Sequence, residues 1–135
     1  VEPGKMDNMD LDLKNEASVI ESGCPHFPTI FALGGALKMF NKIGAKNITN
    51  RVLFLNQFLE EKLGEIGIEV INQKEDIHRS GILIAKIKNP KEIAAQLMEK
   101  KIFVSVRGEG VRISTSIFNN EDDILKLIDE LKNIL

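Results

Sequence analysis

The segment from Lys101 to Ser114, KIFVSVRGEGVRIS, constrains the fold more than any other part of this 135-residue chain. Two short runs rich in β-branched and aromatic residues flank Gly108-Glu109-Gly110, and this pattern predicts an antiparallel hairpin with a tight turn. A hairpin alone is barely stable in water, so it needs further strands or helices that cover its apolar face. The hairpin therefore predicts a sheet whose other strands and covering helices lie elsewhere in the chain.

Two helices are predicted before the hairpin, because apolar residues recur there at helical spacing. The first begins near Pro28, which suits a first helical turn, and Gly44 is expected to end it. The second begins at about Ile48 and is expected to end at Gly67. Their apolar faces consist of Ile30, Phe31, Leu33, Leu37 and Phe40 in the first helix, and Val52, Leu55, Leu59, Leu63 and Ile66 in the second.

Two further strands and two further helices complete the pattern. Branched apolar residues predict strands at residues 68–71 and 81–88. Asn89, which a proline follows, is predicted to cap a third helix. Asn120 is predicted to cap the last helix, with Asp123 at the third position and acidic residues in the first turn.

The predicted order is helix, helix, strand, strand, helix, strand, strand, helix. We therefore expect an α+β two-layer sandwich with a small, mainly antiparallel sheet and helices packed on one face. Residues 1–22 are polar and lack a sustained period, so they are expected to form a connecting arm to a domain at residues 23–135. Because the chain begins with Val1 rather than methionine, we expect it to be processed or to be part of a longer protein.

Composition excludes several classes of partner. A formal charge of −2 and aromatic residues limited to phenylalanine argue against nucleic acid and against an anionic membrane. No apolar run approaches the ~20 residues that a membrane helix needs. Cys24 is the single cysteine, which excludes an internal disulfide and suits a reducing cytoplasm. Cys24, His26 and His78 are too scattered to suggest a metal site.

Arg112 is the most unusual residue of the predicted sheet. It lies between Val111 and Ile113 in the second hairpin strand, where a permanently charged guanidinium is costly to bury. One interpretation is that its side chain reaches solvent past a sheet edge or pairs with an acid such as Glu109. The other is a receptor for a carboxylate or phosphate, which a guanidinium binds through two parallel hydrogen bonds. The pattern alone leaves both interpretations open.

Three segments, in the same order, resemble the C-terminal small domain of class V aminotransferase-like enzymes. GCPHFPTIFALGGAL, at residues 23–37, is similar to their G-T-P-N-[FY]-P motif and the helix of small residues that follows it. RSGIL, at residues 79–83, resembles the R-S-G-I that opens a strand of that domain. VRISTSIFNNEDDI, at residues 111–124, resembles R-x-S-x-x-x-Y-N-T-x-E-D-I. This fold type I group depends on pyridoxal 5′-phosphate and includes cysteine desulfurases and selenocysteine lyase-like proteins.

The resemblance implies roles for individual residues. Arg112 occupies the place of the arginine that binds the α-carboxylate of an amino acid substrate. Gly23 and Cys24 occupy the place of a Gly-Thr pair that contributes to the cofactor phosphate site of the neighbouring subunit in a homodimer. The thiol of Cys24 is a poor hydrogen-bond partner, so the backbone amides are the expected contacts. Asn119 and Asn120 match the N-T pair, and helix capping accounts for Asn120.

The resemblance also implies parts that lie outside this chain. The cofactor lysine and the cofactor itself belong to a large domain that would precede Val1, so the chain alone is expected to bind no pyridoxal phosphate and to be inactive. Desulfurases carry a nucleophilic cysteine in an R-x-G-H-x-C context before the arginine strand, but residues 107–110 read RGEG. Sulfur transfer through an enzyme persulfide is therefore disfavoured. Phe118 replaces the usual tyrosine.

Two other functions stay open on the residues alone. The chain could be a free-standing α+β binding or regulatory module that senses an amino acid by its carboxylate. It could also be an interaction domain that packs through Phe31, Phe54 and Phe58. Arg107 is either a solvated hairpin residue or a second cation near the substrate, and His26 replaces the asparagine of the family motif. The reaction itself, transamination, elimination or racemisation, also stays open.

Overall fold

The computed structural model describes residues 15, 23–71, 75 and 78–135. The chain divides into two compact units, Val1–Met39 and Phe40–Leu135, which are described separately below. Apart from Asn15, the arm predicted for residues 1–22 lies outside the described residues.

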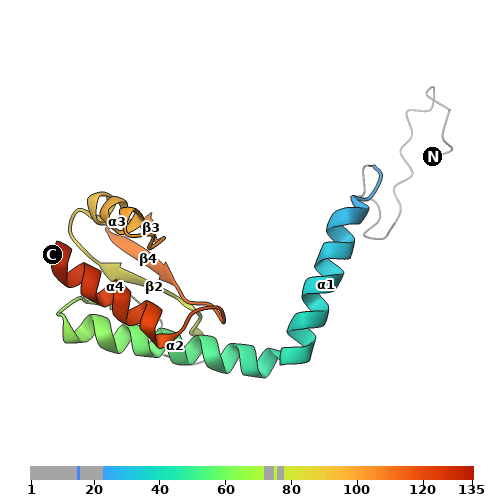
Figure 1. The fold of residues 1–135 in the computed structure, drawn as a ribbon, viewed down its shortest axis with the longest axis horizontal. Coiled ribbons are helices and arrows are strands. Elements are labelled where there is room, and N and C mark those ends of the chain that lie inside the picture. The colour runs from blue at the N-terminus through green and yellow to red at the C-terminus, as the bar shows by residue number, and fades with distance from the viewer. Residues whose placement is uncertain (1–14, 16–22, 72–74, 76–77) are drawn as a thin grey trace. The chain divides into compact units, whose positions relative to one another are not determined.

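The secondary structure follows the predicted order, and the α+β class is confirmed (Figure 1). The elements are α1 (Phe27–Ile43), α2 (Ala45–Glu65), β1 (Val70–Ile71), β2 (Ile82–Lys86), α3 (Pro90–Glu99), β3 (Ser105–Arg107), β4 (Gly110–Ser114) and α4 (Glu121–Ile134).

Gly44 separates the first two helices, as predicted. Its φ of 88° lies in the left-handed region that glycine adopts at little cost, and its amide donates to the carbonyl of Phe40. The predicted start of α2 at Ile48 is late, because the chain re-enters helical geometry at Ala45, directly after the glycine. The described residues of α1 include none that is buried, although the helix is rich in apolar side chains.

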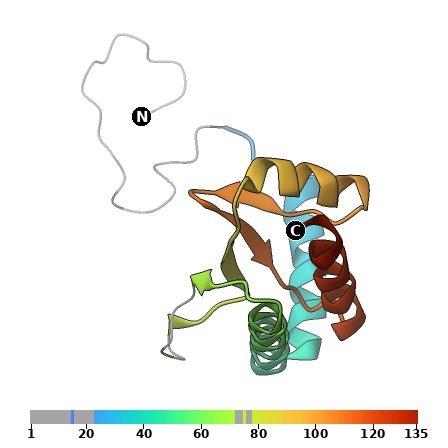
Figure 2. The ribbon, with the colours of Figure 1, turned by 90° about the vertical axis from the view of Figure 1, so that its left-hand side faces the viewer.

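The second unit contains a four-stranded sheet in the order β1-β2-β4-β3, with every neighbouring pair antiparallel. The predicted hairpin joins β3 to β4, and α3 connects β2 to β3. Helices α2, α3 and α4 all pack on one face of this sheet, with α4 in contact with both other helices (Figure 2). The two-layer arrangement predicted for the domain is therefore confirmed.

The core lies between that face of the sheet and the three helices. Leu55, Leu59 and Leu63 repeat on α2 at helical spacing and are fully buried. The remaining buried apolar residues are Ile68, Leu83, Ala85, Ile87, Ile93, Leu97, Val111, Ile113, Ile124, Leu127, Ile128 and Leu131. Phe58 is half-buried and packs against this core, whereas Phe54 and Phe31 are exposed.

The RSGIL segment holds the start of β2 against α2. Arg79 donates to Glu60 of α2 over 2.7 Å. A Cβ atom at Gly81 would lie 2.5 Å from Cγ1 of Val52 and 2.7 Å from the carbonyl oxygen of Thr115. The amide of Thr115 donates to the carbonyl of Gly81 over 2.7 Å, which joins the ends of β2 and β4. Glycine is therefore required where the helix and both strands meet.

The last two helices begin differently. Asn120 caps α4 as predicted: its side chain accepts from the amide of Asp123, whose carboxylate accepts from the amide of Asn120. Asn89 occupies the cap position of α3, but its φ of 54° is left-handed and its side chain makes no capping hydrogen bond. The prediction that Asn89 caps through its side chain is therefore wrong.

None of the helices in the part of the chain that the structure describes is long and apolar enough to cross a membrane. In the same part of the chain, no group of three or more histidine, cysteine, aspartate or glutamate side chains is placed to hold a metal ion.

Candidate functional site

One face of the sheet is packed against α2, α3 and α4, and alternate residues of the strands project from the other. We call this second surface the open face. From β2 it carries Ile82, Ile84 and Lys86, which alternate with the buried Leu83 and Ala85. From β3 and β4 it carries Ser105, Arg107, Arg112 and Ser114. Pairing register aligns these side chains across the strands.

Arg112 lies in the middle of the open face. It is on an inner strand, where its Cα partners are Ile84 of β2 and Ser105 of β3. The residue is half-buried, and its Nε is buried without a hydrogen-bond partner. No ion pair joins Arg112 to Glu109 or to another residue in the described part of the chain. The strand of Arg112 is therefore not the sheet edge, and its guanidinium keeps donors for a ligand.

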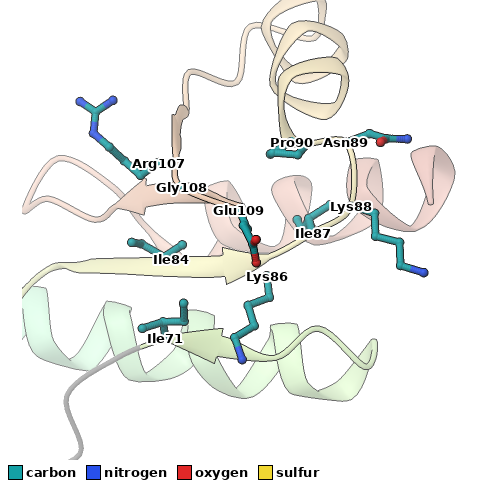
Figure 3. Close-up of a pocket in the computed structure, with 11 residues that line it drawn as sticks. Ile71, Ile84, Lys86, Ile87, Lys88, Asn89, Pro90, Arg107, Gly108 and Glu109 are labelled. Atoms are coloured by element: carbon teal, nitrogen blue, oxygen red, sulfur yellow. The ribbon is translucent and has the colours of Figure 1, made fainter.

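A groove of about 940 Å³ opens beside the β3–β4 hairpin, and we call it the hairpin groove (Figure 3). Its lining comes from the end of β1, from β2 and the segment after it, and from the hairpin turn. The residues are Ile71, Ile84, Lys86, Ile87, Lys88, Asn89, Pro90, Arg107, Gly108, Glu109 and Gly110. Arg112 is outside this lining, but its neighbour Ile84 belongs to it. The groove thus continues the part of the open face that Arg112 occupies.

Positive charge predominates around the groove. Lys86 is neutralised by Glu69, with Nζ 2.6 Å from Oε1. Lys88 and Arg107 make no ion pair with the residues that the structure describes, and Arg107 donates only to the backbone carbonyl of Val106 over 2.9 Å. Glu109 is the single acidic residue of the lining. Lys88 and Arg107 thus have no acidic partner among the described residues, and Figure 3 shows both side chains projecting away from the groove.

The hairpin turn depends on two glycines. Arg107 pairs with Gly110, so the turn consists of Gly108 and Glu109 rather than the three residues predicted. Gly108 has a φ of 55°, as the first central residue of a type II′ turn requires. A Cβ atom at Gly110 would lie 2.5 Å from the carbonyl oxygen of Ala85 and 2.7 Å from Cγ2 of Ile84. The hairpin can lie this close to β2 because Gly110 has no side chain.

Gly23 and Cys24 belong to the first unit, whereas Arg112 and the hairpin groove belong to the second. Both residues precede α1 and are exposed. A Cβ atom at Gly23 would meet no atom within 4 Å. His26, also before α1, shares a hydrogen bond with the hydroxyl of Thr29 in the first turn of that helix. These contacts give His26 a local structural role.

The asparagine pair and Phe118 are placed before α4. Asn119 accepts from the amide of Ser116 and donates to Asp123, so it extends the capping network of Asn120. Phe118 is 77% exposed. Both asparagines therefore serve to cap α4.

The sequence matches the class-V aminotransferase family over residues 4–127. The chain belongs to this family. An uncharacterized aminotransferase of Schizosaccharomyces pombe is 31% identical over 105 residues, which cover 77% of this chain and 26% of the relative.

Two solved structures share the fold. The apo structure of a cysteine desulfurase from Thermococcus onnurineus NA1 has a TM-score of 0.80 at 17% identity, covering 90% of this chain and 34% of that chain. An alanine–glyoxylate aminotransferase from Nostoc sp. has a TM-score of 0.69 at 20% identity, covering 88% and 34%. The chain thus spans only about a quarter to a third of these three proteins.

Full-length enzymes of this family depend on pyridoxal 5′-phosphate. The cofactor binds to a lysine amine, and the hairpin groove offers Lys86 and Lys88. The amine of Lys86 is held by Glu69, and Figure 3 shows the side chain of Lys88 pointing away from the groove. Neither lysine of the hairpin groove is therefore placed to hold the cofactor there.

Proposed function

We propose that this chain is the small domain of a pyridoxal-phosphate-dependent enzyme that acts on an amino acid, and that Arg112 binds the α-carboxylate of the substrate. The observation that carries this proposal is a half-buried guanidinium on an inner strand, with a buried Nε that lacks a partner. Leaving such a group unpaired costs stability. A carboxylate would restore the missing hydrogen bonds and would be oriented by the planar guanidinium.

The rigid sheet supports this role for Arg112. Strand β4 is paired on both sides, and the packed side chains of Val111 and Ile113 hold the backbone on either side of the arginine. A bound carboxylate would therefore be held at a constant position and angle, as a reaction at the neighbouring α-carbon requires. When bound, the cofactor supplies the chemistry by withdrawing electrons from that carbon.

The cofactor would be held by other parts of a larger enzyme. Relatives about two and a half to three times as long as this chain support a large domain that carries the cofactor lysine. In a homodimer, the backbone amides of Gly23 and Cys24 would contribute to the phosphate site of the neighbouring subunit. Their exposure before α1 leaves these amides open to such a contact.

Sulfur transfer through an enzyme persulfide is not the proposed reaction, although one structural neighbour is a cysteine desulfurase. The turn between β3 and β4 contains glycine and glutamate and no cysteine, and Cys24 is the single cysteine of the sequence. A thiolate nucleophile is therefore missing beside Arg112. The proposal favours chemistry in which the amino acid itself is transformed, as in an aminotransferase or a lyase.

Carboxylate binding by this chain tests the role of Arg112. Nuclear magnetic resonance titrations with L-alanine and with ethylamine, which lacks the carboxylate, would be compared for the native chain, Arg112→Lys and Arg112→Met. We expect L-alanine to shift the amide signals of Val111, Ile113 and Ile84, and Arg112→Met to weaken its binding about tenfold or more, because charge-assisted hydrogen bonds are lost.

Arg112→Lys keeps the positive charge but loses the planar guanidinium and its two parallel hydrogen bonds. Its affinity for L-alanine should therefore lie between those of the native chain and Arg112→Met. Lys132→Met, which removes an exposed cation of α4, is the matched control and should bind like the native chain. Equal affinity of the native chain and Arg112→Met for L-alanine would refute the proposal.

A further inference from the structure

We infer that the hairpin groove receives the side chain of the amino acid substrate, that this side chain is apolar, and that Ile84 and Ile71 form the surface on which it lies. This inference rests on the proposed role of Arg112, because the groove is assigned relative to a carboxylate bound there. It narrows the class of substrate within the proposed function.

The open face is apolar on the side of Arg112 where β2 and β1 lie. The strand order β1-β2-β4-β3 places first β2 and then β1 on that side of β4. Ile84 is the cross-strand neighbour of Arg112, and Ile71 is the next residue in the same row. Ile71 is 54% exposed, and Ile82, which follows the same face of β2, is 46% exposed. Accessible hydrocarbon therefore begins directly beside the arginine.

The hairpin groove starts on these isoleucines. Ile84 and Ile71 both line it, and Figure 3 shows them on neighbouring strands. Neighbouring strands lie about 4.8 Å apart, so Ile71 is roughly 10 Å from Arg112 across the sheet. Gly110 leaves Ile84 uncovered, since a Cβ atom at position 110 would lie 2.7 Å from Cγ2 of Ile84. An amino acid bound to Arg112 by its carboxylate can therefore extend its side chain over Ile84 towards Ile71.

The cations of the lining offer no partner to a charged end group on this surface. The amine of Lys86 is neutralised by Glu69, with Nζ 2.6 Å from Oε1. Figure 3 shows the side chains of Arg107 and Lys88 projecting away from the groove. An anionic end group would therefore lose water at the isoleucines without gaining an ion pair, which costs free energy.

Glu109 is the remaining charged residue of the lining. It lies in the hairpin turn, beyond the end of β4, whereas Ile84 pairs with Arg112 inside the strand. A side chain that crosses the strands from Arg112 leads to Ile71 and not to the turn. A cationic end group on that path would also lose water without a partner, whereas methylene groups gain by contact with the isoleucines.

The test compares four amino acids in nuclear magnetic resonance titrations: L-alanine, L-norleucine, L-lysine and L-glutamate. L-Norleucine and L-lysine have the same carbon chain and differ in the terminal ammonium. We expect the native chain to bind L-norleucine about tenfold more tightly than L-alanine, because three further carbon atoms are partly removed from water. L-Lysine and L-glutamate should bind no more tightly than L-alanine. L-Norleucine, unlike L-alanine, should also shift the amide signal of Ile71.

Two variants locate the side chain. Ile84→Ser and Ile71→Ser should each reduce the preference for L-norleucine to about threefold or less, because hydrocarbon contact is lost. Ile71 is an exposed residue at the end of an edge strand, so Ile71→Ser tests the inference even if Ile84→Ser does not fold. Leu125→Ser, which removes a 41% exposed apolar side chain from α4, is the matched control and should keep the tenfold preference.

The outcomes separate this inference from the proposed function. If the native chain binds L-norleucine no more tightly than L-alanine or L-lysine, or if Ile71→Ser keeps the full preference, the inference is overturned. The role of Arg112 would still stand on the weaker binding of every ligand by Arg112→Met. If Arg112→Met binds L-alanine and L-norleucine like the native chain, the proposed function fails, and the assignment of the groove fails with it.

Discussion

At the scale of single residues, Arg51 and Glu121 form an ion pair with two hydrogen bonds in the second unit. Both guanidinium nitrogens Nη1 and Nη2 donate to the carboxylate, over 2.9 and 2.8 Å. Arg51 also lies over the ring of Phe54, with 5.4 Å from its Cζ to the ring centroid. The pair connects the second turn of α2 to the first residue of α4, and the two residues are 70 positions apart in the sequence. Its hydrogen bonds, followed by a backbone hydrogen bond at the start of α4, lower the pKa of Glu121 to about 2.

This pair predicts a specific acid sensitivity. Because the pKa of Glu121 falls from 4.5 to about 2 on folding, its contribution to stability is present above pH 4.5 and is lost as the pH falls towards 2. Arg51→Met should therefore lower the melting temperature at pH 6, and the difference from the native chain should shrink between pH 4.5 and pH 2. Thermal unfolding followed by circular dichroism across that range measures the effect. Parallel melting curves for the two proteins would contradict it.

At the scale of elements, α3 and α4 show how far a local pattern determines structure. An asparagine precedes each helix, and the sequence predicts a cap at both. Asn120 forms the cap because its backbone is extended, which turns its side chain towards the amide of Asp123. Asn89 has to connect β2 to α3 in a tight turn and adopts left-handed geometry, which removes its side chain from the cap. The tight connection between β2 and α3 therefore determines the conformation of Asn89, and the sequence around Asn89 does not indicate it.

The two asparagines should respond differently to substitution. Asn120→Ala should cost about 1 kcal/mol of unfolding free energy, because the capping hydrogen bond to Asp123 is lost. Asn89→Gly should leave stability unchanged or raise it, because no capping bond is lost and glycine suits a φ of 54°. Urea denaturation of both variants measures the difference. If Asn89→Gly lost as much free energy of unfolding as Asn120→Ala, the Asn89 side chain would stabilise the fold by a contact other than a capping hydrogen bond.

At the scale of the whole molecule, the sequence predicts the layers better than the site. The order of elements follows from helical and strand periods. Residues 82–85 are all apolar, so the structure rather than the sequence identifies Leu83 and Ala85 as the buried residues of β2. The central position of Arg112 depends instead on the connection through α3. Because α3 leads the chain from β2 to the edge strand β3, β4 pairs between β2 and β3. The hairpin groove combines residue 71, residues 84 and 86–90, and residues 107–110, and no local pattern relates these segments.

The distribution of buried residues predicts which part of the chain carries its stability. Every buried apolar side chain among the described residues lies between Leu55 and Leu131, within the second unit. Deleting residues 1–39 should therefore leave the urea midpoint and the slope of the transition nearly unchanged, since little apolar surface is removed from the core. Leu59→Ala, which empties a fully buried position on α2, should cost about 2–5 kcal/mol in either background.

A fall of more than about 1 kcal/mol in the free energy of unfolding on deletion, which exceeds the effect of most surface changes, would mean that the first unit stabilises the second. The open face and its arginines would then have to be studied in the longer chain alone, whereas an unchanged midpoint makes residues 40–135 sufficient for every titration of Arg112 and the hairpin groove.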